Sequence, residues 1–306
     1  FFTDRGETQA VKGAGFAIGE GDFFGIVGES GSGKSVTTKS ILRLGPSNCK
    51  IMGGEILFRG EDILKKNEAE LREIRGGEIA MIFQDSLSAL NPVYTVGNKM
   101  VELIRRHTNM NKKEAKARVL ELLTAVGITD PEKAMNSYPH ELSGGMRQRV
   151  MIAMAMSSDP KILIADEPTT ALDVTIQAQI LHLLLELQKK NNMSIILITH
   201  DLGVVAQTCK RVAVMCGGYV VEEGTVEEIF LHPGHPYTQA LIASMPRVGG
   251  TFEQFLERDL SDGNGDLCPF LNRCKYADKT CEACLPKYYE ASEGHRIFCH
   301  KREEKR

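Results

Sequence analysis

The sequence lacks an apolar run long enough to cross a membrane. Its longest fully apolar run, at 150–156, has seven residues, whereas a spanning helix needs roughly 20. The start of the chain lacks the charged, apolar and small-residue pattern of a secretory signal. An excess of basic charge is also missing, because the 306 residues carry a net charge of −3 at pH 7. We therefore predict that the chain does not cross a bilayer alone and does not bind nucleic acid.

Apolar strands alternate with helices over most of the chain, which indicates an α/β fold with a largely parallel sheet. Strands are predicted at 22–27, 79–83, 161–165, 194–199 and 211–216, and helices at about 34–44 and 174–190. Two amphipathic patterns within 95–126 predict a helical insertion at about 88–155. The length and composition allow one large domain, predicted over 1–232, and an extension over 233–306. Within the extension we expect a short helix in HPYTQALIASMP and a linker at 247–266.

The stretch GESGSGKS, at 28–35, fits the phosphate-binding pattern G-x-x-x-x-G-K-[ST] between a predicted strand and a predicted helix. Its glycines let backbone N–H groups converge on phosphate oxygens, Lys34 can reach the β- and γ-phosphates, and Ser35 can bind Mg²⁺. The alternative is a flexible glycine turn, which the strand-to-helix context disfavours. The predicted nucleotide contacts are Gly28, Ser30, Gly31, Ser32, Gly33, Lys34, Ser35 and Val36.

Two adjacent carboxylates, Asp166 and Glu167, follow the apolar strand ILIA. The carboxyl ends of parallel strands are where an α/β sheet binds its ligand. We expect Asp166 to hold Mg²⁺ and Glu167 to act as the general base that polarises the attacking water. The alternative is a solvated acidic pair at the start of a helix.

Gln84 and His200 also follow apolar strands, so both can lie at this edge of the sheet. Gln84 suits coordination of water or Mg²⁺, and His200 suits a hydrogen bond to the γ-phosphate. Each could instead be a satisfied polar residue at a strand end. The convergence of several strand ends favours the catalytic interpretation.

A second glycine-rich stretch, LSGGMRQR at 142–149, opens another predicted helix. Ser143 can cap this helix, and Gly144 and Gly145 expose backbone N–H groups, so the stretch predicts a second anion site. Because it follows the helical insertion, we expect it to act on the nucleotide of another copy. The sequence therefore predicts a dimer.

These motifs and their order resemble the ATP-binding subunits of ABC transporters over almost the whole chain. The resemblance implies an ABC-type P-loop domain with a RecA-like core, a small β subdomain and a helical insertion. It also implies a head-to-tail dimer with two ATP molecules in its interface. Asp173, in TALD at 170–173, is implied as a further nucleotide contact.

Longer segments, such as YPHELSGGMRQRVMIAMAM and GHPYTQALIASMP, resemble the oligopeptide and dipeptide importers, a group that includes nickel importers. This resemblance implies two membrane permeases, a substrate-binding protein and a second ATPase subunit, with a heterodimer favoured over a homodimer. It places the chain at the cytoplasmic face of a prokaryotic membrane. The alternatives are import of nickel or another small solute, a soluble ABC ATPase acting on nucleic acid or ribosomes, and an efflux motor.

The chain departs from the family pattern at two places. Ser86 stands where proline is expected. The aromatic residue that stacks on adenine should lie at the very N-terminus, and we assign it to Phe2, with Phe1 or an upstream residue as alternatives. The chain begins with Phe1 rather than Met, and its opening has the pattern of the middle of a strand. We therefore expect a short piece of chain upstream.

Five of the eight cysteines lie within 268–299. Thiolates in such a segment can hold an iron–sulfur cluster or Zn²⁺. The cysteines could instead form disulfides or stay as free thiols. The spacing resembles the tail of peptide-importer ATPases, which implies a [4Fe–4S] cluster on Cys268, Cys274, Cys281 and Cys299. For zinc, the pair Cys281 and Cys284 would be completed by His295 or His300.

Overall fold

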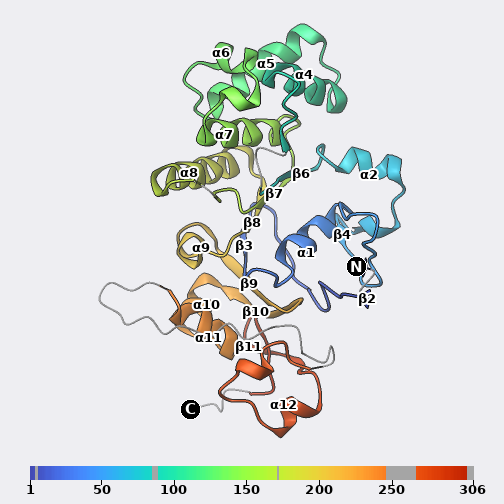
Figure 1. Ribbon diagram of the computed structural model, residues 1–306, viewed down its shortest axis with the longest axis vertical. Helices are drawn as coiled ribbons and strands as arrows, with labels where there is room; N and C mark the ends of the chain where they lie inside the picture. The colour runs from blue at the N-terminus through green and yellow to red at the C-terminus, as the bar shows by residue number, and fades with distance from the viewer. Residues whose placement is uncertain (4–5, 85–88, 171, 246–266, 302–306) are drawn as a thin grey trace. The chain divides into compact units, whose positions relative to one another are not determined.

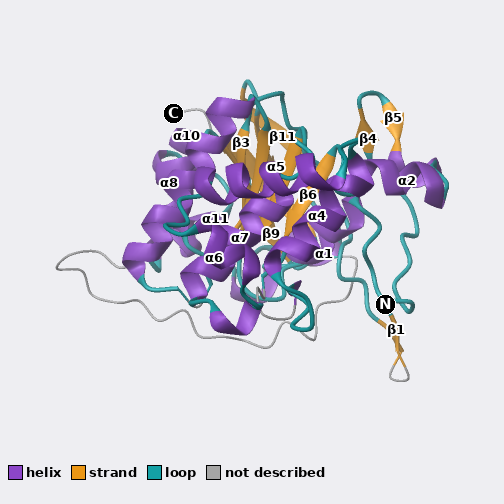
Figure 2. Ribbon diagram, turned by 90° about the horizontal axis from the view of Figure 1, so that it is seen from above, coloured by secondary structure: helices purple, strands orange, loops and turns teal. Residues whose placement is uncertain are grey.

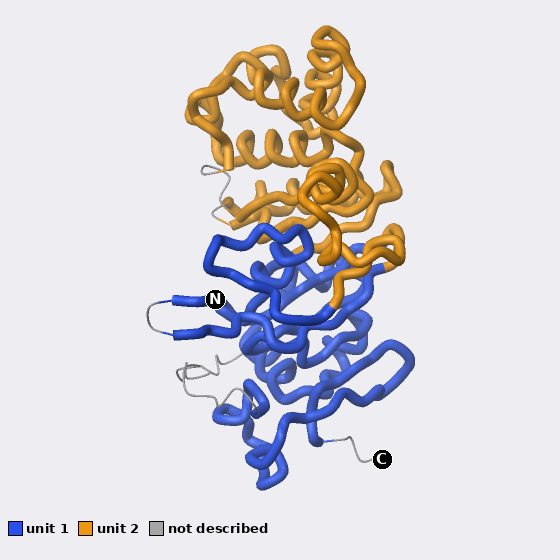
Figure 3. The backbone as a smooth tube through the Cα atoms, turned by 90° about the vertical axis from the view of Figure 1, so that its right-hand side faces the viewer, with its two compact units in different colours: residues 1–18, 22–54, 198–306 blue, residues 19–21, 55–197 orange. Residues whose placement is uncertain are grey.

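The computed structural model describes residues 1–3, 6–84, 89–170, 172–245 and 267–301. The chain divides into two compact units (Figure 3). Unit 1 comprises 1–18, 22–54 and 198–306, and unit 2 comprises 19–21 and 55–197. The expected linker at 247–266 and Ser86 lie outside the described residues. The predicted domain boundary after residue 232 stays a prediction.

Unit 1 contains a run of sheet in the order β11-β12-β10-β9-β3 (Figure 1). The bounds are β3 Phe23–Val27, β9 Arg211–Cys216, β10 Tyr219–Thr225, β11 Tyr288–Ser292 and β12 His295–Phe298. Every residue of β3 is buried, and β3 runs parallel to β9 with Val27 opposite Val214. Strand β3 is therefore a continuous apolar run, as expected of a strand covered on both faces.

The tail contains a β-hairpin, which the sequence did not lead us to predict. β11 and β12 pair antiparallel, and β12 continues the sheet beside β10, where Ile297 lies opposite Glu222. Phe270 and Phe298 are buried in the same apolar core as Tyr219 and Tyr237. The tail therefore has apolar material of its own, spread over short segments that carry little periodicity.

The helices of unit 1 include the one that follows the glycine-rich loop. The bounds are α1 Lys34–Ile41, α9 Leu202–Thr208, α10 Val226–Leu231, α11 Pro236–Ala243, the 3₁₀ turn η4 Leu271–Arg273 and α12 Lys279–Ala283. A small antiparallel pair joins β1 Phe2–Thr3 to β2 Gly6–Glu7. Helix α1 ends before the predicted residue 44 because Arg43 has a left-handed φ of 51°.

Unit 2 contains strands in the order β8-β7-β6. The bounds are β6 Ile79–Ile82, β7 Ile162–Asp166 and β8 Ser194–Ile198, whose last residue already belongs to unit 1. β6 and β7 are parallel, with Ile82 opposite Ala165. Figure 2 shows the small hairpin of β4 Leu57–Phe58 and β5 Glu61–Asp62, followed by the 3₁₀ turn η1 Ile63–Lys65 and α2 Glu68–Ile74.

The helical insertion of unit 2 is a bundle in which α4 and α5 contact each other and both contact α6 and α7 (Figure 1). The bounds are α4 Val96–His107, α5 Lys112–Ala125, α6 Pro131–Asn136, η2 Pro139–Glu141, α7 Gly144–Ala155 and, following β7, α8 Val174–Asn191. Asn111 and Glu114 form a capping box at the start of α5. Within the described residues, no helix combines the length and the apolar content that a membrane crossing requires.

Candidate active site

The loop at 28–35 requires glycine because backbone groups approach it closely. Gly28 has a φ of 151°, and a Cβ added there would lie 2.2 Å from the carbonyl oxygen of Met215. Gly33 has a φ of 100°, and its Cβ would lie 2.6 Å from the carbonyl oxygen of Ala10. The loop thus packs directly on backbone and leads into α1, whose first N–H groups have no intrahelical acceptor and suit a phosphate.

Lys34 and Ser32 add polar groups to this loop. Lys34 is 5% exposed, and its ammonium donates to the carbonyl oxygens of Gly28 and Glu29, both at 2.7 Å. The ammonium is therefore held across the loop, within reach of phosphate oxygens bound there. The hydroxyl of Ser32 is buried and has no hydrogen-bond partner among the residues described. A buried hydroxyl of this kind fits a loop that binds an anionic ligand.

His200 follows β8 directly and is exposed. The N–H of Thr199 donates to the carbonyl oxygen of Ile26 at 3.2 Å, so the end of β8 lies beside the end of β3 in unit 1. His200 and the glycine-rich loop therefore follow neighbouring strands. Asp201, the next residue, caps α9 by accepting from the N–H of Gly203 at 2.8 Å.

Asp166 and Glu167 differ in environment and backbone conformation. Asp166 ends β7 and is 1% exposed, whereas Glu167 is half-buried. Glu167 has a left-handed φ of 46°, which is uncommon for a residue with a side chain and concentrates at functional sites. No pattern in the sequence indicates this conformation.

Gln84 and Glu167 contact each other, as their positions after β6 and β7 predict. The amide nitrogen Nε2 of Gln84 donates to Oε2 of Glu167 at 2.8 Å. The hydroxyl of Thr170 donates to the same oxygen at 2.9 Å. Two donors on one carboxylate oxygen hold the side chain in one orientation, as a general base requires. The contact of Thr170 with Glu167 was not predicted. The only local indication of it in the sequence is that Thr170 lies three residues after Glu167.

The donor groups present fit Mg²⁺, which prefers hard oxygen ligands. In unit 2 these are the buried carboxylate of Asp166 and the side-chain amide oxygen of Gln84. In unit 1 the hydroxyl of Ser35 follows Lys34 in the first turn of α1. Their roles as Mg²⁺ ligands stay a prediction.

The second glycine-rich stretch opens α7, as predicted. The side chain of Ser143 caps this helix by accepting from the N–H of Met146 at 3.3 Å. A Cβ at Gly145 would lie 3.1 Å from Cγ2 of Ile176 in α8, so glycine allows α7 to approach α8 closely. Asp173 caps α8 by accepting from the N–H of Ile176 at 3.0 Å. Helix α7 is long enough to present a helix N-terminus to an anion.

Phe2, assigned to adenine stacking, lies in β1 and is 41% exposed. The ammonium of Lys50 lies 5.3 Å from the centre of its ring. An exposed aromatic ring is compatible with stacking on a base, and the assignment stays a prediction.

The HPY segment joins the tail to the sheet of unit 1. The carboxylate of Glu222, fully buried, accepts from the N–H groups of Gly234 and His235, at 2.8 and 2.9 Å, and contacts Nε2 of His295 at 2.7 Å. Burial lowers the pKa of His235 to about 4, so its imidazole is neutral, and its Nδ1 accepts from the N–H of Tyr237 at the start of α11. These residues therefore fix α11 against β10.

The four cysteines assigned to the iron–sulfur cluster line one pocket. They are Cys268, Cys274, Cys281 and Cys299. Burial is the main cause that raises the pKa of Cys268 to about 11, and the charges of the other three add to it. None of the eight cysteines forms a disulfide. In the described parts of the chain, no three His, Cys, Asp or Glu residues stand close enough to share a metal ion.

The groups considered for zinc are less well placed. Cys284 is exposed and does not line the pocket. His295 contacts the buried carboxylate of Glu222 and does not line it either. His300 lines the pocket, but its Nε2 contacts the carbonyl oxygen of Cys284 at 2.9 Å.

Two family models match the chain. The model described as "ABC transporter" matches residues 11–170, and the one described as "Oligopeptide/dipeptide transporter, C-terminal region" matches residues 221–281.

Curated relatives are similar along nearly the whole chain. The oligopeptide transport ATP-binding protein OppD of Bacillus subtilis is 50% identical over 305 residues, which cover 97% of this chain and 85% of that protein. The dipeptide transport ATP-binding protein DppD of Bacillus subtilis is 49% identical, with coverage of 98% and 91%. DppD of Escherichia coli is 47% identical, with coverage of 95% and 90%.

Solved structures are similar as well. The ATP-binding cassette MJ0796, a dimer bound to ADP and Pi, is 32% identical, with a TM-score of 0.64 over 71% of this chain and 90% of that chain. CbiO1 of Clostridium perfringens, part of an ABC transporter complex, is 31% identical, with a TM-score of 0.65 over 76% and 88%.

The fold and the glycine-rich loop define a P-loop nucleotide-binding protein of the α/β class. The chain belongs to the ABC transporter family. Its C-terminal region is of the oligopeptide/dipeptide transporter type. The resemblance and the fold class predicted from the motifs are therefore confirmed.

Proposed function

We propose that this chain is the ATP-hydrolysing subunit of a membrane ABC importer for oligopeptides or dipeptides. The main observation in favour of ATP hydrolysis is the pair of hydrogen bonds that Gln84 and Thr170 donate to Glu167. The names of the relatives, which are dipeptide and oligopeptide transport ATP-binding proteins, support the cargo.

Different residues have different roles in ATP hydrolysis. The loop at 28–35 and Lys34 bind the phosphates, and His200 contacts the γ-phosphate. Gln84 and Thr170 hold the carboxylate of Glu167 in place, and Glu167 accepts a proton from the attacking water. Ser35, Asp166 and Gln84 would hold Mg²⁺, which would supply positive charge to neutralise the charge that develops on the phosphate oxygens.

A second protomer completes each nucleotide site. The capped N-terminus of α7, with Ser143, Gly144 and Gly145, offers N–H groups to the γ-phosphate bound by the other protomer, and Asp173 lies at the start of the neighbouring α8. The dimeric cassette MJ0796 supports this arrangement. We favour a heterodimer with a second ATPase subunit, docked on two permeases at the cytoplasmic face of a prokaryotic membrane and supplied by a substrate-binding protein.

Uptake in cells tests the cargo. In a strain without this gene, ATP-dependent uptake of a labelled tripeptide is expected to be lost, while nickel uptake is unchanged. The parent chain should restore peptide uptake, and Lys34→Ala, which removes the ammonium at the phosphate loop, should not. Loss of nickel uptake with intact peptide uptake would instead identify a metal importer.

We propose that the cysteine pocket binds a [4Fe–4S] cluster rather than zinc, because the spacing of its cysteines resembles that of the tail of peptide-importer ATPases. Four thiolates at the corners of a cluster bind four different irons, whereas four zinc ligands all lie about 2.3 Å from one ion. The four cysteines line one pocket, as the ligands of one shared cluster must. A bound cluster would cross-link the segments that carry the four cysteines, and so stabilise the tail.

Cysteine substitution separates the two metals. Cys281→Ser removes a thiol that lines the pocket, and Cys284→Ser removes an exposed one outside it. Anaerobically purified parent protein is expected to absorb at about 400 nm and to contain iron and sulfide, as bound iron–sulfur clusters do. Cys281→Ser should lose this absorbance and Cys284→Ser should keep it. A colourless parent protein with stoichiometric zinc would contradict the cluster.

A further inference from the structure

Glu29, inside the phosphate-binding loop, is held by two residues of the C-terminal extension. Its carboxylate accepts two hydrogen bonds from the guanidinium of Arg273, at 2.9 and 2.8 Å. Its backbone N–H donates to the hydroxyl oxygen of Tyr237 at 2.8 Å. All three residues belong to unit 1. One loop residue is therefore fixed through both its side chain and its backbone.

The Arg273 side chain is well placed to make a strong contact. It is 10% exposed, and its guanidinium lies 5.1 Å from the ring centre of Phe270 and 5.9 Å from that of Tyr237. The hydrogen bond to Glu29 is the main cause that raises the pKa of Arg273. A bidentate arginine–carboxylate pair is stronger and more directional than a single ion pair.

A carboxylate is an unexpected group in a loop that binds phosphates. Left without a cation, the Glu29 carboxylate would repel the negative triphosphate, because like charges at short distance destabilise each other. Arg273 supplies the compensating charge from the extension. Arg273 is also joined to the cysteine pocket, because Leu271 of the same 3₁₀ turn and Cys274, which follows that turn, line the pocket.

We propose that Arg273 and Tyr237 are positioning residues of the ATP site, through which the C-terminal extension neutralises Glu29 and sets the affinity of the phosphate-binding loop for ATP. This inference rests on the proposed role of the loop at 28–35. It assigns the extension a part in nucleotide binding, in addition to packing on the sheet.

The experiment measures the Kd for ATP, KM, kcat and thermal unfolding for variants of the full chain. Arg273→Gln is expected to raise Kd and KM about tenfold, with little change in kcat. A tenfold change lies at the lower end of the free-energy range for losing a hydrogen bond to a charged group. The double variant Glu29→Gln with Arg273→Gln removes both charges and should recover most of the affinity. That recovery separates charge compensation from general damage.

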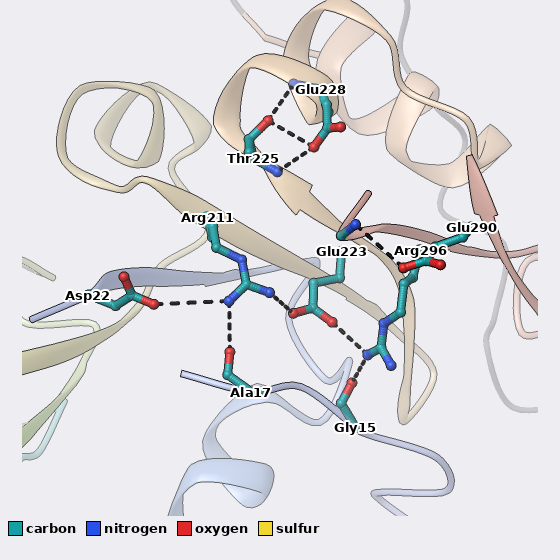
Figure 4. A network of polar contacts seen from close by, with 10 residues as sticks. Gly15, Ala17, Asp22, Arg211, Glu223, Thr225, Glu228, Glu290 and Arg296 are labelled. Atoms are coloured by element: carbon teal, nitrogen blue, oxygen red, sulfur yellow. Dashed lines mark hydrogen bonds and ion pairs between the residues drawn. The ribbon is translucent and has the colours of Figure 1, made fainter. Parts of the chain in front are cut away.

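Arg296→Gln is the matched control. Arg296 also joins the extension to the rest of unit 1, through Glu223 at 2.6 Å and the carbonyl oxygen of Gly15 at 2.7 Å (Figure 4). This variant loses a single arginine–carboxylate ion pair outside the loop, so its Kd for ATP should equal that of the parent. Because Arg296 is 40% exposed and makes one contact with Glu223, its melting temperature should fall no further than that of Arg273→Gln.

Three results would overturn the inference: parental affinity in Arg273→Gln, an equal loss in Arg296→Gln, or no recovery in the double variant. The variant Lys34→Ala tests separately whether the loop at 28–35 binds the phosphates of ATP. If Lys34→Ala binds ATP as the parent does, the phosphate-binding role itself is wrong. If Lys34→Ala abolishes binding while Arg273→Gln does not weaken it, only the inference about the extension is wrong.

Discussion

Glu167→Gln is expected to lower ATP turnover by about 10²- to 10⁴-fold, the range that general-base catalysis contributes, and to leave ATP binding intact. The substitution keeps the shape of the side chain but removes its ability to take a proton. The donors Gln84 and Thr170 can still reach the amide oxygen, so the local packing should persist. Single-turnover hydrolysis and ATP titration on the same preparation separate the two effects.

Two further variants make this prediction specific. Thr170→Val removes one of the two donors to Glu167 and is expected to reduce turnover by less than Glu167→Gln does, because Gln84 still orients the carboxylate. Glu121→Gln changes an exposed carboxylate that pairs with Arg118 in the helical insertion, and turnover should stay parental. Unchanged turnover in Glu167→Gln would remove Glu167 as the base. ATP-bound dimers accumulating in Glu167→Gln would support the two-protomer site.

The meeting of Gln84 and Glu167 could be predicted because it follows from a rule that needs no coordinates. Two apolar runs that pair as parallel strands end at the same edge, and the first polar residues after them are then neighbours. The same rule placed the loop after β3 and His200 after β8. For the loop and His200 the rule predicts only a shared edge, and the structure adds that β3 and β8 are neighbours.

The contacts of the extension could not be predicted in this way. Glu222 and Ile297 pair across a long stretch of chain, and no local pattern in β10 indicates an antiparallel partner. The contact between Glu29 and Arg273 is also long-range. From its residue type alone, each would be expected to lie at the surface in contact with solvent. The left-handed backbone of Glu167 reflects its tertiary surroundings, since residues with a side chain of this size rarely adopt it by local preference.

Gly28→Ala is expected to abolish detectable ATP binding, because the loop cannot keep its conformation with a methyl group there. The added Cβ would lie 2.2 Å from the carbonyl oxygen of Met215, a backbone atom of β9 that cannot move without disturbing the sheet. We expect the variant to lose about 2 kcal/mol or more of folding free energy, as strained and overpacked positions do. Chemical denaturation and ATP titration measure the two losses.

Gly31→Ala is the control for backbone strain in the same loop. Gly31 also has a positive φ, 78°, but a Cβ there would meet no atom within 4 Å. Its cost in stability should therefore be only the left-handed penalty, about 1–2 kcal/mol. If both variants unfold at the same denaturant concentration, close packing of Gly28 on β9 is not what fixes the loop. A larger loss of folding free energy for Gly28→Ala than for Gly31→Ala would show that contact with the sheet, as well as the flexibility of glycine, determines the conformation of the loop.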